Sequence, residues 1–170
     1  MIDLRPFLVA APTEQPVTLA DAKLHCRVDH DDEDSLINGL IAAAAAHLDG
    51  WGGVLGRAIM TQTWRVRIPC AGVHRLPMPD VTEARATYDD ATTDTLDLTV
   101  TAGGWEIAAA QAGWVEFDCA LPAAQLPAMR AAILMLVGHW YLNREAVGDA
   151  KAALPIGAES LIGAMRWRRI

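Results

Sequence analysis

The sequence predicts an α+β protein: a helical bundle with a small antiparallel β-sheet inserted between the second and third long helices, followed by a C-terminal tail. Apolar residues recur with helical spacing before residue 50 and again after residue 127. Between these segments, residues 61–119 alternate apolar and polar side chains and are punctuated by Pro and Gly, as strands and turns are. We therefore expect an N-terminal arm over residues 1–17, a domain over residues 18–150 with helices in 18–50 and 127–145, and a tail over residues 151–170.

Composition limits the class of protein. A chain of 170 residues with 52% hydrophobic and 21% charged residues is typical of one folded globular domain. The net charge of −7 argues against a general nucleic-acid binder, although the last ten residues contain three arginines and no acid. No apolar run reaches the ~18 residues of a membrane span, and the apolar patch near the N-terminus is too short for a signal peptide.

The three cysteines, Cys26, Cys70 and Cys119, are odd in number, far apart and free of any CxxC spacing. This pattern favours neither a disulfide framework nor a thiolate zinc site. We expect buried free thiols in a reducing compartment.

Two helices are predicted before the β region. Thr18 and Asp21 have the spacing of a capping box, which predicts a short helix over residues 19–27. The second helix is expected to continue to about Gly50. Its apolar face consists of Leu36, Ile37, Leu40, Ile41, Ala44, Leu48 and Trp51.

The opposite face of the second helix is unusual because it is uncharged. No Lys, Arg, Asp or Glu occurs between Asp34 and Asp49, whereas a surface helix normally carries charges on its outer side. A second packing partner is therefore predicted there, and subunit packing would involve Ala42, Ala43 and Ala46, beside Asn38, Gly39 and His47.

Residues 29–34 combine five acids with one histidine, which invites a metal or catalytic interpretation. An EF-hand loop starting at Asp29 would need Gly and Glu where Asp34 and Leu40 stand, so this motif does not match. Nearby His25 and Cys26 are adjacent on a helix and point in different directions. We therefore expect no metal and no cofactor.

The acids have a simpler explanation as charges at the start of the second helix. Asp31 or Asp32 is expected to cap this helix, and the helix dipole favours acids in the first turn. The run would then form a solvated rim or face a channel, with the candidate residues Asp29, Asp31, Asp32, Glu33 and Asp34.

Strands are predicted where apolar and polar residues alternate. If the first and last strands pair, Arg65 is expected to face Glu116. Arg67 is expected to lie near Asp118 in the same way. The predicted strands are 61–68, 81–88, 96–100, 105–108 and 114–119.

The third long helix is predicted to be a core helix. Pro127 suits its first turn, and the thirteen residues between Arg130 and Arg144 carry no formal charge. His139 within it is expected to be a core histidine bonded to a neighbour rather than a general base.

The tail is predicted to contain a short helix from about Glu159, after a break at Pro155 and Gly157. The RWRR sequence that follows could contact phosphate. Three arginines around one tryptophan more often bind a protein groove.

None of the catalytic templates GxSxG, HExxH, P-loop or GxGxxG occurs. Two rival interpretations remain open. One is a small metal-dependent enzyme that uses the His/Asp cluster, and the other is a regulatory or DNA-binding module that uses the basic tail.

Four stretches, taken in order, resemble the head–tail connector (adaptor) proteins of long-tailed bacteriophages and of phage-derived gene transfer agents. They are Thr18–Asp34 running into LINGLIAAAAAHLDGW, TQTW at 61–64, AILMLVGHWYLNRE at 132–145 and LPIGAESLI at 154–162. Cys26 stands where the family suggests Leu, and the tail continues into RWRRI; both are mild departures.

The resemblance implies a virion structural protein without an active site. It implies a ring, usually of twelve copies, beneath the portal protein at the neck of the particle, assembled in the host bacterial cytoplasm. The ring would extend the channel for double-stranded DNA without sequence-specific contacts, and would join the head to the next connector, stopper or tail component, with no membrane partner. The residues implied to bind the portal are Leu161, Ile162, Met165, Arg166, Trp167, Arg168 and Arg169.

Overall fold

The computed structural model describes residues 5–144 and 155–167. Within these ranges the chain forms four α-helices, one 3-10 turn and eight strands in two antiparallel sheets. The helices are α1 (Leu19–Cys26), α2 (Asp34–Leu48), α3 (Leu126–Leu142) and α4 (Ile156–Met165), and the 3-10 turn η1 is Ala123–Gln125. The strands are β1 (Phe7–Ala10), β2 (Gln62–Ile68), β3 (Gly72–Arg75), β4 (Val81–Tyr88), β5 (Thr93–Thr95), β6 (Leu98–Thr101), β7 (Gly104–Ala109) and β8 (Gly113–Cys119).

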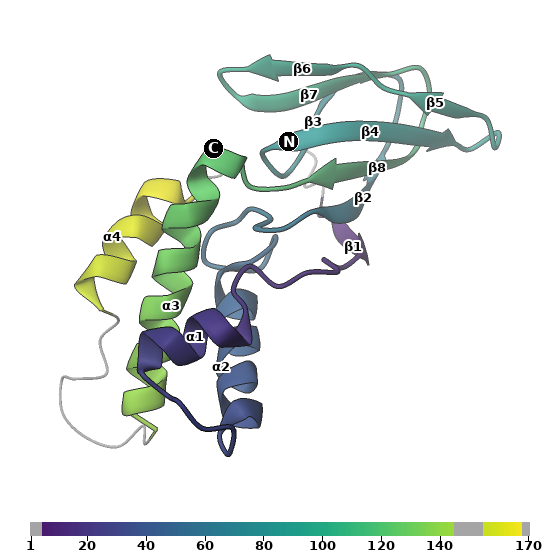
Figure 1. Ribbon diagram of the computed structural model, residues 1–170. Helices are drawn as coiled ribbons and strands as arrows, with labels where there is room; N and C mark the ends of the chain where they lie inside the picture. The colour runs from purple at the N-terminus through teal and green to yellow at the C-terminus, as the bar shows by residue number, and fades with distance from the viewer. Residues whose placement is uncertain (1–4, 145–154, 168–170) are drawn as a thin grey trace.

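The helices form one half of the molecule and the strands the other (Figure 1). α3 packs against α2 on one side and α4 on the other, and α1 lies across α2 and α3. Their shared core includes Ile37 and Ile41 from α2, Ile133 and Leu136 from α3, and Ile162 from α4. The last helix is therefore part of the bundle.

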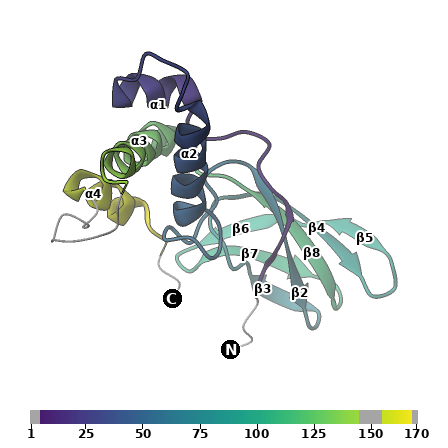
Figure 2. The ribbon, with the colours of Figure 1, turned by 90° about the horizontal axis from the view of Figure 1, so that it is seen from below.

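The strands build two sheets over a second core. The larger sheet has the order β1-β2-β8-β4-β5 and the smaller one β3-β7-β6, and Figure 2 shows both beside the helical half. Val66 on β2, Phe117 on β8 and Ile107 on β7 are fully or almost fully buried in this core. The insertion between α2 and α3 is thus a two-sheet unit with its own apolar centre.

The α+β class, the insertion and the first helix start are confirmed. Thr18 Oγ1 accepts from the Asp21 amide at 3.1 Å, and Asp21 Oδ2 accepts from the Thr18 amide at 3.3 Å, which completes the capping box. β2 buries every second residue, as predicted. It also pairs with β8, which is the condition stated for the Arg65 contact. Arg65 faces Glu116 across this pair.

Several element predictions were wrong. There are two sheets rather than one, because β3, β7 and β6 pair with one another in a separate sheet. β3 and β5 were not predicted, since both are short strands with little apolar alternation. The arm contributes edge strand β1, which pairs with β2. Gly157 lies inside α4 instead of breaking it.

Two detailed contacts also differ from expectation. Neither Asp31 nor Asp32 caps α2, because its N-cap residue is Glu33, without a side-chain cap bond. Arg67 lies opposite Trp114 and pairs with Asp89 rather than Asp118.

The cysteines were predicted to be buried, and only Cys119 is. Cys26 is half-buried at the end of α1, and Cys70 is exposed between β2 and β3. All three are free thiols.

α3 is only partly a core helix. One face is buried, whereas Leu142 near its end is 81% exposed. His139 is half-buried, and its ring lies 3.4 Å from the Asn143 amide nitrogen. The uncharged part of α3 therefore packs against the helical core on one side and is partly exposed on the other.

Candidate functional site

The outer face of α2 is uncharged and open. We call Asn38, Gly39, Ala42, Ala43, Ala46 and His47 the neutral α2 face. All six residues are exposed, because α2 packs its other side onto α3 and α1. A helix that presents small neutral residues allows close approach of another surface.

The acidic run is held by specific partners. Lys23 Nζ on α1 lies 2.6 Å from Asp31 and 2.7 Å from Asp34. These bonds lower the pKa of Asp31 and raise that of Lys23. Two of the five acids are therefore paired with Lys23.

Glu33 connects the same loop to α3. It accepts a hydrogen bond from the Tyr141 hydroxyl and lies 2.6 Å from Arg144. The Tyr141 bond, followed by Arg144, lowers the pKa of Glu33. Asp29 and Asp32 remain exposed, and Asp32 lies 3.9 Å from His30.

Metal-binding geometry is lacking in the described residues, where no group of three or more His, Cys, Asp or Glu side chains could hold an ion. Over the same ranges no helix has the length and apolarity required to cross a bilayer.

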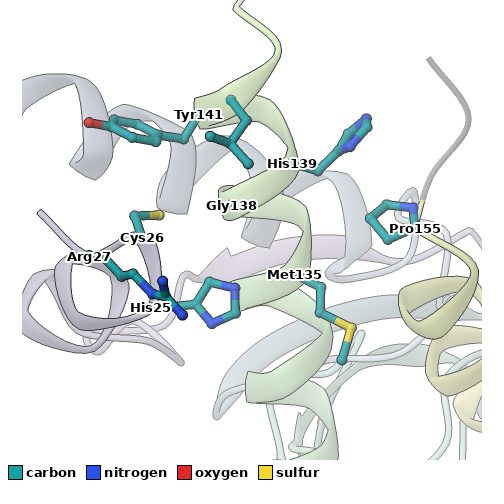
Figure 3. A pocket seen from close by; sticks show the side chains of 9 residues that line it. His25, Cys26, Arg27, Met135, Gly138, His139, Tyr141 and Pro155 are labelled. Carbon is teal, nitrogen blue, oxygen red and sulfur yellow. The ribbon is translucent and has the colours of Figure 1, made fainter. Parts of the chain in front are cut away.

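A groove of about 490 Å³ lies between α1, α3 and the start of α4. Figure 3 shows His25 directed at α3 beside Gly138, whereas His139 lies toward Pro155. The structure thus places the two histidines on different sides of α3. Cys26 also lines the groove, which is mainly apolar.

The residues expected to bind a portal differ in how exposed they are. Ile162 and Met165 are buried in the bundle core, and Leu161 and Trp167 are half-buried. Arg166 is exposed. Arg168 and Arg169 lie outside the described residues.

One important side chain was missed by the sequence reasoning. Arg57, in the loop between α2 and β2, is only 8% exposed. Its Nε and Nη2 donate to Asp80, and its Nη1 donates to the Met165 carbonyl at 2.8 Å. The same Nη1 lies 3.3 Å from Gln125 Oε1. The signal available was a lone charge within the otherwise uncharged residues 50–64.

Comparison with known proteins agrees with this architecture. Residues 16–77 match the family model described as phage gp6-like head-tail connector protein. This range contains α1, α2, β2 and β3. No curated protein sequence matches the chain.

Solved structures match nearly the whole chain. A chain in the virion of a native gene transfer agent (GTA) particle has a TM-score of 0.68 and 19% identity, over 97% of this chain and 96% of that one. A chain in the neck of an empty GTA particle, computed with C6 symmetry, has a TM-score of 0.66 and 18% identity, over 98% and 97%. A third, in the neck of a native GTA particle computed with C12 symmetry, has a TM-score of 0.56 and 18% identity, over 99% and 97%.

The protein therefore has the fold of a chain found in GTA particles. Its first two helices and the start of its β insertion lie in the range that matches the gp6-like head-tail connector model. The resemblance stated from the sequence is confirmed.

Proposed function

We propose that this protein is a virion structural protein, a head–tail connector at the neck of a phage or phage-like particle. The observation that carries the proposal is the combination of the connector signature at residues 16–77 with a fold shared, from end to end, with chains of GTA particles. The proposal assigns no catalytic activity, and the role is mechanical: joining head to tail.

A ring of identical copies is the proposed form. Two of the similar structures are necks computed with C6 and C12 symmetry, which supports a dodecamer here. A ring needs a heterologous contact that repeats around the axis. The neutral α2 face is the proposed contribution to this contact, through Ala42, Ala43 and Ala46.

The remaining surfaces are assigned by charge and position. The exposed Arg166 begins a basic segment proposed to bind the portal. Asp29 and Asp32 are proposed to lie on a rim that repels the DNA backbone, so that double-stranded DNA passes without sticking. The face away from the portal would receive the next connector, stopper or tail component.

Electron microscopy of the purified protein mixed with its portal tests the proposal. We expect rings on the portal for the wild type. Ala43→Arg should prevent ring formation without lowering the melting temperature, because its side chain is exposed. Ala102→Arg, exposed in the β6–β7 turn, is the matched control and should keep the ring.

Absence of rings in the wild-type mixture would contradict the proposal. Stoichiometric metal in the purified protein would instead favour a small metal-dependent enzyme. Salt-sensitive DNA binding by the isolated protein would favour a regulatory module that uses the basic tail.

A further inference from the structure

The end of α4 is held by directional contacts at the junction between the helices and the sheets. Arg57 reaches Asp80 immediately before β4, Gln125 immediately before α3 and Met165 in the last turn of α4. These three partners lie in three separate parts of the chain, and one guanidinium connects them all.

The residues after α4 are fixed by a second pair of contacts. The chain becomes extended at Arg166. The Trp167 amide donates to the Leu55 carbonyl at 2.8 Å, two residues before Arg57. The Trp167 ring also packs edge-to-face on Trp105 of β7, with 6.1 Å between ring centroids.

Arginine has the chemistry that this position requires. The last carbonyls of a helix lack partners within the helix, and the helix dipole favours a cation there. The planar guanidinium presents five donors in a fixed fork, so one edge can bind Asp80 while the other reaches Met165 and Gln125. A lysine ammonium would keep the charge but could not span these partners together.

The apolar contacts of α4 do not by themselves fix its end. Ala158, Ile162 and Met165 are buried in the bundle core. Burial of this kind is non-directional and tolerates small shifts along a neighbouring helix. A hydrogen bond to a single carbonyl is directional, so the Arg57–Met165 contact sets the position of the last turn.

We infer that Arg57 is a positioning residue for the C-terminal segment: it fixes the last turn of α4 and, with the Leu55 carbonyl, places Arg166 and Trp167. The biological consequence rests on the proposed function, because Arg166 and Trp167 begin the segment proposed to bind the portal. The placement itself is a property of the free protein.

Hydrogen–deuterium exchange of the full-length protein tests the placement. Arg57→Lys keeps the charge opposite Asp80 and removes the fork. We expect amides in the second half of α4 to exchange about tenfold faster or more, the ratio expected for loss of one hydrogen bond to a charged group. Amides of α2 and α3 should keep their wild-type rates.

Arg67→Lys is the matched control. Arg67 also makes a two-point ion pair, with Asp89, but on the exposed face of the larger sheet. It should leave exchange in α4 unchanged. Equal α4 rates in Arg57→Lys and the wild type would overturn the inference, as would a uniform increase in all helices, which indicates a general structural role.

A second variant covers the case in which Arg57→Lys does not fold. The double variant Arg57→Met with Asp80→Asn removes both buried charges together, which avoids an unpaired buried carboxylate. It too should loosen the end of α4 selectively, and wild-type exchange in α4 would overturn the inference.

Binding to portal-bearing heads separates this inference from the proposed function. The amount of protein that co-sediments with portal-bearing heads should fall about tenfold for Arg57→Lys, because Arg166 and Trp167 are no longer held in place. Alanine at Arg166, Arg168 and Arg169 together should abolish it. If both variants still bind heads normally while α4 is loosened, the portal role is wrong and the positioning by Arg57 stands.

Discussion

The carboxylate of Glu33 accepts a hydrogen bond from the hydroxyl of Tyr141, which lies 108 residues later in the chain. Glu33 is the N-cap residue of α2, and Tyr141 lies near the end of α3. The contact ties the acidic loop to the C-terminal end of α3. Three acids of the run therefore have structural partners. Glu33 joins the start of α2 to α3, and Asp31 and Asp34 bind Lys23.

Glu33→Gln is expected to destabilise the protein in a pH-dependent way. Its partners lower the pKa of Glu33 in the folded protein. The stabilisation is therefore present above the unfolded pKa and is lost as pH falls through the lowered folded pKa. Melting temperatures should differ between wild type and variant at pH 7 and converge in strong acid. Asp32→Asn is the control, and an equal effect from it would contradict a specific role for Glu33.

Ile162→Ala tests whether α4 belongs to the core. Ile162 is 5% exposed, whereas Ile156 on the same helix is 86% exposed. Truncating the buried isoleucine should cost about 2–5 kcal/mol in free energy of unfolding, from lost burial and the cavity left behind. Ile156→Ala should change it by less than about 0.5 kcal/mol. Denaturant unfolding measures both, and equal small losses would mean that α4 does not pack as described.

The sequence predicted the elements whose pattern reflects burial within one segment. The alternation in β2 predicted which side of the strand is buried, and every second residue is indeed buried. Its pairing with β8 was only the condition under which Arg65 was expected to face Glu116. β3 and β5 were not predicted. Their residues do not alternate between buried and exposed, and only hydrogen bonding to a neighbouring strand makes them strands. The role of Arg57 could not be predicted, because its partner Met165 lies 108 residues away and contributes only a backbone carbonyl.

The same limit applies to the candidate site. Helical periodicity alone defines the neutral α2 face, and the structure leaves it exposed. That another surface packs on it stays a prediction. The apolar side of α4 was also visible in the sequence. Periodicity does not say what an apolar side packs against, and here Ile162 and Met165 pack against the chain itself.

Gly53→Ala is expected to disrupt the turn that follows α2. A Cβ atom at Gly53 would lie 2.2 Å from the Asp49 carbonyl oxygen and 2.4 Å from that of Leu48, which are backbone atoms that cannot move aside cheaply. A loss of about 2 kcal/mol or more is expected, by analogy with overpacked cores, which lowers the melting temperature by roughly 4–8 °C. Gly52→Ala is the matched control, because its Cβ would meet nothing within 4 Å. Equal melting temperatures for the two variants would contradict the close approach at Gly53.

The three thiols are expected to react with iodoacetamide in a fixed order. The thiolate is the nucleophile, so exposure and pKa together set the rate. Cys70 is exposed and should react first. Burial raises the pKa of Cys26, and burial with nearby acids raises the pKa of Cys119 to about 12, so Cys119 should react only after unfolding. Intact-mass spectrometry at pH 8 should show one fast adduct, which Cys70→Ser removes; fast labelling of Cys119 in the folded protein would mean that the core between the two sheets opens readily.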